Sequence, residues 1–350
     1  MILVSLGNLG DLLIQAAFLR RFDRPGVSIA VPESYRAIAA ELFPQASVIP
    51  LANRWDGREL IAARMERAVA VELILKELRG QHPGVEGLSI ALTDDLILQR
   101  SLNIYEAYWT LFGRDPRLAG MLVPETYPTV AGEWIPFEHL PRWTGGTSPR
   151  TVWFCPWGGI GVKNVDEADL AALQQAATRM GCEARLLASP RDDVSAYRFF
   201  DGASVVRLSN ERLMADAVSH LSRSALVVAV DTAWYHLAAM IGAPVLGIPG
   251  PRSLRHFEFP GRKHALSVPE QRLCADCFST DACVVNGSRG CEAKPDRQQL
   301  AGALEANLSG RPLTSTRRAS IPFRQAAGLK RTGWRVAFRA LNVASRIFPN

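Results

Sequence analysis

The sequence of 350 residues lacks three features that would settle its class directly. No apolar run reaches the roughly 18 residues that a membrane-spanning helix needs. The opening stretch MILVSLG has no basic residue, so it lacks the positively charged start of a secretory signal. The chain also has no Gly-x-Gly-x-x-Gly pattern, so an NAD-dependent enzyme, suggested by the glycines near residue 7, is the weakest alternative. We therefore expect a cytoplasmic protein without a membrane-spanning helix.

Acidic residues are missing from the end of the sequence, because none follows Glu305. The same stretch holds nine basic residues: Arg311, Arg317, Arg318, Arg324, Lys330, Arg331, Arg335, Arg339 and Arg346. The whole chain has a formal net charge of +6, so without these nine charges the remainder stands at −3. A basic body would suggest nucleic acid, which we do not expect here. A basic tail on a mildly acidic body favours a local anionic partner.

Cysteine is scarce, with six residues in the chain. Cys155 and Cys182 stand in apolar surroundings and are expected in the core. The other four occur together in the stretch CADCFSTDACVVNGSRGC, as Cys274, Cys277, Cys283 and Cys291. Four thiols with a Cys-x-x-Cys start favour a structural site for zinc or iron, with a stabilising role. Two disulfides, or reduced and merely packed thiols, remain open alternatives.

Strands and helices alternate along the sequence, with short connections in the second half. In the first half we expect strands at 2–5 and 27–31 and a helix at 11–22. In the second half we expect strands at 151–155, 184–188, 205–208, 225–230 and 244–248, helices at 167–180, 211–221 and 232–241, and a short helix after Asp192. The stretch PRWTGGTSPR (141–150) has the composition of a linker. The pattern predicts two α/β domains with parallel sheets and a cleft between them, at 1–145 and 146–308, followed by a tail at 309–350.

An acid and a hydroxyl group follow the apolar run ALVVAV (225–230) at the start of an expected helix. Ligands of open parallel sheets bind beyond the carboxyl ends of strands, and the first turn of a helix attracts anions. Thr232 and His236 are four residues apart and share one helix face. This arrangement predicts a phosphate site. In the alternative interpretation, Asp231 only caps the helix and His236 is a satisfied buried histidine.

The stretch VDTAWYHLAAMIGAPVLGIPGP (230–251) resembles the signature of glycosyltransferase family 9, the ADP-heptose:lipopolysaccharide heptosyltransferases. Ten positions match in order: Asp231, Thr232, His236, Leu237, Ala238, Ala239, Gly242, Pro244, Gly250 and Pro251. Two positions depart from the signature. Ala233 replaces a glycine, and Arg252 replaces a threonine, although an arginine can bind phosphate through two hydrogen bonds.

Two stretches outside this signature resemble the catalytic and phosphate-binding motifs of the same family. GNLGDLL (7–13) matches the motif whose aspartate is the catalytic base, which implies that role for Asp11. Gln15 and Ala17 replace the Thr and Pro that usually follow. WFCPWGGIGVKN (153–164) resembles the loop whose lysine, here Lys163, contacts the donor diphosphate.

The stretch LLASPRDD (186–193) lies where the family has a glutamate on the donor ribose. Asp192 or Asp193 is the expected substitute, because a carboxylate accepts hydrogen bonds from both ribose hydroxyls. The complete set of residues implied in donor binding is Lys163, Asp192, Asp193, Asp231, Thr232, His236, Gly250 and Arg252.

The resemblance implies a two-domain GT-B fold and an inverting sugar transfer that needs no metal or other cofactor. Asp11 would take the proton of the acceptor hydroxyl as the sugar–phosphate bond breaks. Lys163, the helix start at Thr232, and the side chains of His236 and Arg252 would stabilise the charge on the departing diphosphate. A helix cap for Asp11 and a solvated surface position for Lys163 are the alternatives without catalysis.

The tail combines a flexible start with a basic amphipathic end. Residues 309–324 are rich in Ser, Thr, Pro and Arg, and from residue 329 a helix with a basic face and an aromatic-bearing apolar face is expected. Such a helix is typical of peripheral binding to an anionic membrane, here by residues 325–350 at the inner membrane. Packing against the N-terminal domain is the alternative.

The resemblance favours transfer of heptose from ADP-heptose to lipopolysaccharide core or a related lipid-linked glycan. The departures at Gln15, Ala233 and Arg252 keep a second hypothesis open, a non-catalytic protein that binds sugar nucleotides or acts as a scaffold.

Overall fold

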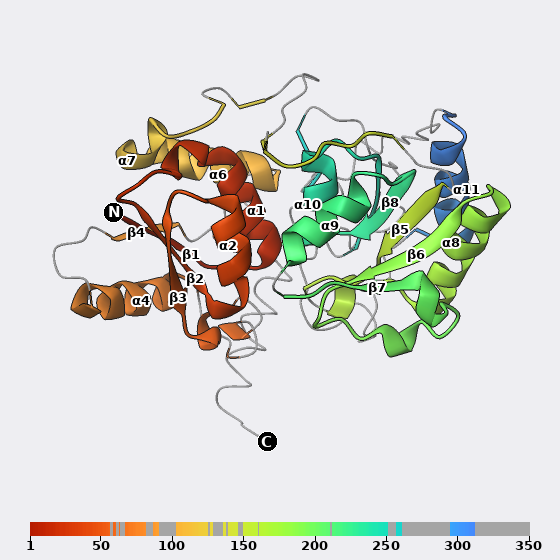
Figure 1. The fold of residues 1–350 in the computed structure, drawn as a ribbon, viewed down its shortest axis with the longest axis horizontal. Helices are drawn as coiled ribbons and strands as arrows, with labels where there is room; N and C mark the ends of the chain where they lie inside the picture. Colours follow the sequence, from red (N-terminus) through yellow and green to blue (C-terminus); the bar gives the residue numbers. More distant parts are fainter. Residues whose placement is uncertain are drawn as a thin grey trace, which may run out of the picture.

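The computed structural model describes the chain over most of its two halves, and each half is built around one parallel sheet (Figure 1). The described residues are 1–56, 59–60, 63, 67–81, 87–90, 103–124, 127–128, 136–137, 139–145, 150–159, 161–210, 212–250, 257–260 and 295–311.

The N-terminal half has four strands in the order β3-β2-β1-β4 within the part that the structure describes. They are β1 (Ile2–Ser5), β2 (Ser28–Pro32), β3 (Ser47–Leu51) and β4 (Gly87–Ile90). The helices are α1 (Leu9–Phe18), α2 (Arg36–Leu42), α4 (Arg67–Gln81), α6 (Ile104–Arg114) and α7 (Pro116–Ala119), with 3₁₀ turns at Arg20–Phe22, Glu33–Tyr35 and Asn53–Trp55. Leu3 in β1 pairs in parallel register with Ile29 and Leu88, so β1 is an interior strand.

The C-terminal half has five strands in the order β7-β6-β5-β8-β9, again among the described residues. They are β5 (Thr151–Cys155), β6 (Glu183–Ala188), β7 (Val205–Arg207), β8 (Leu226–Val230) and β9 (Val245–Ile248). The helices are α8 (Glu167–Arg179), α9 (Leu213–Leu221), α10 (Ala233–Met240) and α11 (Arg297–Leu308), with 3₁₀ turns at Gly161–Lys163, Val194–Ala196 and Gly202–Ser204. All pairs are parallel, and every residue of β8 is buried, as its unbroken apolar sequence predicts.

The inner faces of the two sheets share one apolar core. Leu3 and Val31 from the first sheet belong to the same buried cluster as Val227 and Ala229 from the second. Helices α1, α2 and α6 fill this space from one side and α9 and α10 from the other (Figure 1). The outer faces are covered separately, by α4 on the first sheet and by α8 and α11 on the second. The expected pair of parallel-sheet α/β halves is confirmed.

Several helix ends differ from the sequence prediction. The first helix begins at Leu9 with Asn8 as its N-cap, and it ends at Phe18 before a separate 3₁₀ turn. The short helix expected after Asp192 is a 3₁₀ turn at Val194–Ala196. A glycine follows the end of α8 and of α10, and Gly181 and Gly242 have φ angles of +67° and +90° that favour glycine.

The stretch expected to be a linker is attached to the second half. Residues 141–145 form no helix or strand, but Trp143 donates its backbone N–H to the carbonyl of Ile241 and its indole N–H to that of Ser224. Among the described residues, none of the helices combines the length and apolar character needed to span a bilayer.

Candidate functional site

Two helix N-termini meet between the sheets. Helix α1 follows the carboxyl end of β1, and α10 follows that of β8, so both begin where parallel sheets bind ligands. The two helices touch at Gly10. A Cβ atom on this glycine would lie 3.2 Å from Cδ2 of His236 and 3.7 Å from Cα of Ala233. The absence of a side chain at Gly10 therefore lets the two halves approach closely beside Asp11.

Asp11 is the acidic residue of the α1 N-terminus, and it is 8% exposed. Its Oδ2 accepts the backbone N–H of Asn8 at 2.8 Å, and its Oδ1 accepts the hydroxyl of Tyr108 at 2.7 Å. The sequence alternative for Asp11 was a role as the helix cap. The N-cap residue is Asn8 instead, and Asp11 supports the cap from inside the helix. Asp11 reaches back to the cap from the third helical position, as in a capping box. Both identified donors are electrically neutral.

Lys163 forms an ion pair with Asp231 across the carboxyl ends of β5 and β8. Its Nζ lies 2.5 Å from Oδ2 of Asp231 and 3.4 Å from the carbonyl oxygen of the same residue. The two side chains are 13% and 11% exposed, so Lys163 is not a solvated surface lysine. Gly158 permits this placement, because a Cβ atom there would lie 2.6 Å from Cβ of Lys163. The backbone N–H of Gly158 donates to Asn164 at 2.9 Å and closes the loop.

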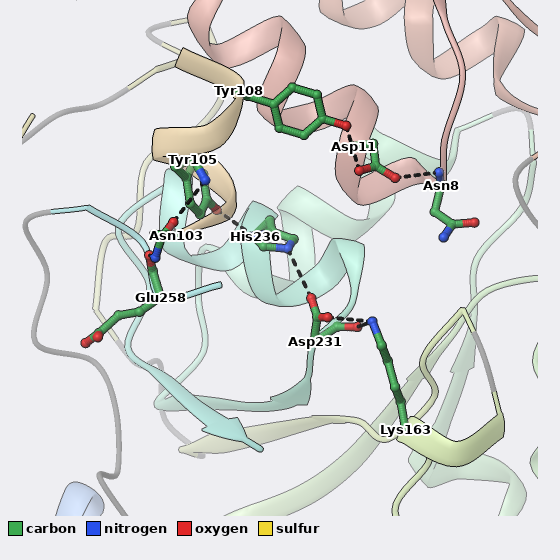
Figure 2. Close-up of polar contacts among 9 residues, drawn as sticks. All are labelled: Asn8, Asp11, Asn103, Tyr105, Tyr108, Lys163, Asp231, His236 and Glu258. Atoms are coloured by element: carbon green, nitrogen blue, oxygen red, sulfur yellow. Dashed lines mark hydrogen bonds and ion pairs between the residues drawn. The ribbon is translucent and has the colours of Figure 1, made fainter. Parts of the chain in front are cut away.

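His236 connects Asp231 to α6 (Figure 2). The Nε2 of His236 lies 3.5 Å from Oδ1 of Asp231, and its Nδ1 lies 2.6 Å from the hydroxyl oxygen of Tyr105. Burial raises the pKa of Tyr105 well above its ordinary value, so the phenol keeps its proton. A Tyr105 hydroxyl that donates to Nδ1 leaves the ring hydrogen on Nε2, where it faces the carboxylate of Asp231.

The structure describes some of the residues expected to bind the donor phosphates, and others lie outside the described part of the chain. Thr232, and not Asp231, is the N-cap of α10, and its side chain makes no capping hydrogen bond. Gly250 follows β9, and a Cβ atom on it would lie 3.9 Å from Cα of Lys163. These positions bring Thr232 and Gly250 to the same edge of the sheet as Lys163. Arg252 lies outside the described residues.

The two aspartates expected at the donor ribose lie in the turn after β6. The Oδ2 of Asp192 accepts the backbone N–H of Ser189 at 2.8 Å, and Oδ1 of Asp193 accepts that of Ser195 at 2.9 Å. The hydrogen bonds from Ser195 hold the pKa of Asp193 below its ordinary value. Both carboxylates therefore shape their own turn at the carboxyl edge of the sheet.

Tyr105 and Tyr108 are site residues that the sequence analysis missed. Both lie on α6 and are fully buried. They are three positions apart, so they lie next to each other on one helix face. The helix sequence IYEAYWTLFGR has several aromatic residues, and nothing in it distinguishes a tyrosine that binds an active group from one that fills a core.

Two of the six cysteines are among the described residues, and the other four are not. Cys155 and Cys182 are buried free thiols, as expected. Cys274, Cys277, Cys283 and Cys291 lie outside the described residues. Within the described part of the chain, no group of three or more His, Cys, Asp or Glu side chains is arranged to hold a metal ion.

Residues 141–285 match the family model of glycosyltransferase family 9 (heptosyltransferase). The chain carries a glycosyltransferase family 9 domain. The resemblance expected from the 230–251 stretch is confirmed, and the enzyme class is glycosyltransferase. The matched segment contains Lys163, Asp231 and His236, whereas Asp11 and α6 precede it.

Two solved structures have a similar fold. One is the ADP-heptose lipopolysaccharide heptosyltransferase II of E. coli, with 17% identity, a TM-score of 0.55, and coverage of 88% of this chain and 98% of that one. The other is a family 9 glycosyltransferase from Veillonella parvula DSM 2008, with 14% identity, a TM-score of 0.56, and coverage of 88% and 97%. These likenesses support the GT-B fold of the glycosyltransferase described here. No curated protein matches it in sequence.

Proposed function

We propose that this glycosyltransferase transfers heptose from ADP-heptose to lipopolysaccharide core or a related lipid-linked glycan. The family match supports the reaction class, and the name of the E. coli structure of similar fold suggests the donor and acceptor to test first. One observation carries the mechanism. The buried carboxylate of Asp11 stands beside the Gly10–His236 contact, and His236 leads to the Lys163–Asp231 ion pair of the other half.

Asp11 acts as the general base. An acceptor hydroxyl gives its proton to the carboxylate while its oxygen forms a bond to the anomeric carbon of the donor. The bond from that carbon to the diphosphate breaks on the opposite face, and the configuration inverts. Each carboxylate oxygen can accept more than one hydrogen bond, so the bonds from Asn8 and Tyr108 orient Asp11 without preventing proton uptake.

The donor diphosphate binds at the start of α10. The backbone N–H groups after Thr232 and the positive end of the helix dipole favour an anion there, and Lys163 adds a full positive charge. Arg252 and His236 contribute further donors, Gly250 lets the backbone approach, and Asp192 or Asp193 accepts from the ribose. Preorganised donors of this kind serve in place of a divalent cation as negative charge develops on the leaving group.

A transfer assay tests this function. Full-length protein is incubated with ADP-heptose and a lipopolysaccharide truncated in its inner core, with and without EDTA. We expect a glycan heavier by one heptosyl residue, an inverted anomeric configuration by NMR, and no effect of the chelator. Tight binding of ADP-heptose in calorimetry without any transfer would contradict the enzyme assignment and favour the non-catalytic alternative.

We also propose that residues 325–350 bind the anionic surface of the inner membrane. The support is the sequence pattern alone, because this segment lies outside the described residues. Each basic residue near an anionic leaflet contributes about 1 kcal/mol, and salt screens the attraction. The full chain should sediment with vesicles that contain anionic lipid and leave them at high salt, and a chain ending at residue 324 should not sediment. Equal binding of both chains would exclude this role.

We propose a structural zinc or iron site for the four cysteines at 274–291, which likewise rests on the sequence pattern. Elemental analysis of protein purified without added metal should find about one equivalent of metal, which is lost when two of these cysteines are replaced by serine. Mass spectrometry that finds two disulfides in this segment would refute the site.

A further inference from the structure

Helix α6 contacts the active groups of both halves. Tyr108 donates to Asp11, and Tyr105, one turn earlier, contacts His236 (Figure 2). We propose that α6 aligns the site, with Tyr108 as the positioning residue for Asp11 and Tyr105 as the positioning residue for His236. This inference rests on the proposed function of Asp11 as the general base.

The Tyr108–Asp11 hydrogen bond is buried. Tyr108 is fully buried, its ring lies 5.7 Å from that of Phe112, and its hydroxyl lies 2.7 Å from Oδ1 of Asp11. Packing fixes the ring, so the hydroxyl defines one direction in which the carboxylate can point. The N–H of Asn8 holds the other oxygen, and together the two bonds set the plane of the carboxylate.

Tyr105 is held against the second half of the molecule. Its ring makes edge contacts with His236 and Phe259, at centroid distances of 5.4 and 5.3 Å. Asn103, the N-cap of α6, donates its side-chain amide to the carbonyl of Glu258 at 2.7 Å. The start of α6 is therefore attached to residues 257–259, although α6 lies in the N-terminal part of the sequence.

One rigid element consequently fixes two groups that come from different sheets. Both tyrosines sit on the same face of α6, so a shift of the helix along its axis would disturb both contacts together. A hydrogen bond from a neutral hydroxyl favours the charged form of a carboxylate, and loss of one such bond changes a proton equilibrium by about tenfold. The two tyrosines should therefore have different kinetic signatures.

The test compares Tyr108→Phe with Tyr105→Phe in the transfer of heptose from ADP-heptose to truncated lipopolysaccharide across pH. For Tyr108→Phe we expect the acid limb of kcat/KM to move up by about one pH unit, with KM for ADP-heptose close to that of the parent protein. For Tyr105→Phe we expect an unshifted acid limb and a KM for ADP-heptose raised by about tenfold, because His236 faces the donor site. The two variants serve as matched controls, since each loses one buried hydroxyl from the same helix.

A second variant covers the case in which Tyr108→Phe does not fold. Incorporation of 3-fluorotyrosine at position 108 keeps the ring and makes the hydroxyl a stronger donor, so the acid limb should move to lower pH. The inference fails if Asp11→Asn is inactive while both changes at Tyr108 leave the acid limb in place. If Asp11→Asn transfers heptose at the normal rate, the proposed base itself is wrong, and the two failures are therefore distinguishable.

Discussion

Two largely shielded aspartates lie near a helix N-terminus, one in each half of this glycosyltransferase. Asp11 lies in the first turn of α1, after interior strand β1, and Asp231 directly precedes α10, after interior strand β8. Their side chains are similarly shielded, but their surroundings differ. Asp11 accepts from a backbone amide and a phenol, whereas Asp231 pairs with the ammonium of Lys163 and faces His236.

The different partners of the two carboxylates indicate which one is suited to proton uptake and which one to positioning other side chains. The hydrogen bonds from Asn8 and Tyr108 orient the carboxylate of Asp11, which suits a group that takes up a proton in the proposed mechanism. Lys163 compensates the charge of Asp231, which suits a group that holds other side chains in place. In the proposed mechanism, one residue type serves two purposes because its neighbours differ.

The most direct test of the comparison between Asp11 and Asp231 is to remove the charge of each aspartate in turn. Asp11→Asn should lower kcat by about 10²- to 10⁴-fold, the usual contribution of a general base, while ADP-heptose affinity in calorimetry stays close to normal. Asp231→Asn should instead leave Lys163 without its partner in a largely buried place, which costs about 3 kcal/mol of unfolding free energy and weakens donor binding. Chemical denaturation measures the first effect and calorimetry the second.

Equal losses of transfer and of stability in these two variants would remove the distinction between the aspartates. A wild-type rate in Asp11→Asn would end the assignment of this residue as the base.

The next largest effect on transfer is expected from substitution of Lys163, the cation of the Lys163–Asp231 pair. Lys163→Met should reduce kcat by about 10²- to 10³-fold, because a preorganised positive charge at the leaving diphosphate is lost. Lys163→Arg keeps the charge and should recover part of the rate. If both substitutions lower stability but leave the kinetics of transfer unchanged, Lys163 serves only to compensate Asp231.

A third aspartate extends the comparison to a contact outside the site. Asp56 is 2% exposed, and it accepts the guanidinium of Arg191 from the other half at 2.9 Å and the hydroxyl of Ser34 at 2.9 Å. Burial alone would lower the pKa of Arg191, but the hydrogen bond and charge of Asp56 raise it. Because 41% of the arginine side chain is exposed, Arg191→Met should cost only about 1 kcal/mol of unfolding free energy.

Arg54→Met is the matched control for Arg191→Met. It removes an arginine from a pair with Glu77 in which both side chains are well exposed, and we expect no measurable change in stability. A loss as large as that of Arg191→Met would show that burial of the acidic partner is unimportant.

A pH-dependent effect is expected for Asp169, a carboxylate close to another acid. Burial and the nearby Asp166 raise the pKa of Asp169 to about 6, against the opposing influence of Arg297. A folded-state pKa above that of the unfolded chain gives stability at low pH that is lost as the pH rises through about 6. The Tm of Asp169→Asn minus that of the parent should therefore grow by a few degrees between about pH 4 and pH 6 and then level off. A flat difference would contradict the raised pKa.

Strands β5, β8 and β9 of the C-terminal sheet could be predicted closely because their sequences are almost entirely apolar. The run ALVVAV and the glycine at 242 place β8 and the end of α10 to within about a residue of the observed bounds. The N-terminal sheet was predicted only in part. Its edge strand β3 contains Pro50 and buries only its last residue, Leu51, so it lacks the alternation that reveals a strand.

The candidate site could be predicted for residues that stand in local motifs, and the structure places Asp11, Lys163, Asp231 and His236 near the contact between the halves. The ion pair of Lys163 with Asp231 was not predicted, because 68 residues separate the two positions and spacing carries no information about it. Tyr105 and Tyr108 were missed for the same reason, since a buried hydroxyl is recognised only by the group that it meets.

The shared inner core has a consequence for how this protein could be divided. Helices α1 and α10 cover each other with apolar side chains, and Trp143 secures residues 141–145 to the second half. Cleavage of the chain near residue 146 and separation of the fragments would expose an apolar surface of each fragment to water. Such fragments should remain associated or aggregate, and neither should fold stably on its own.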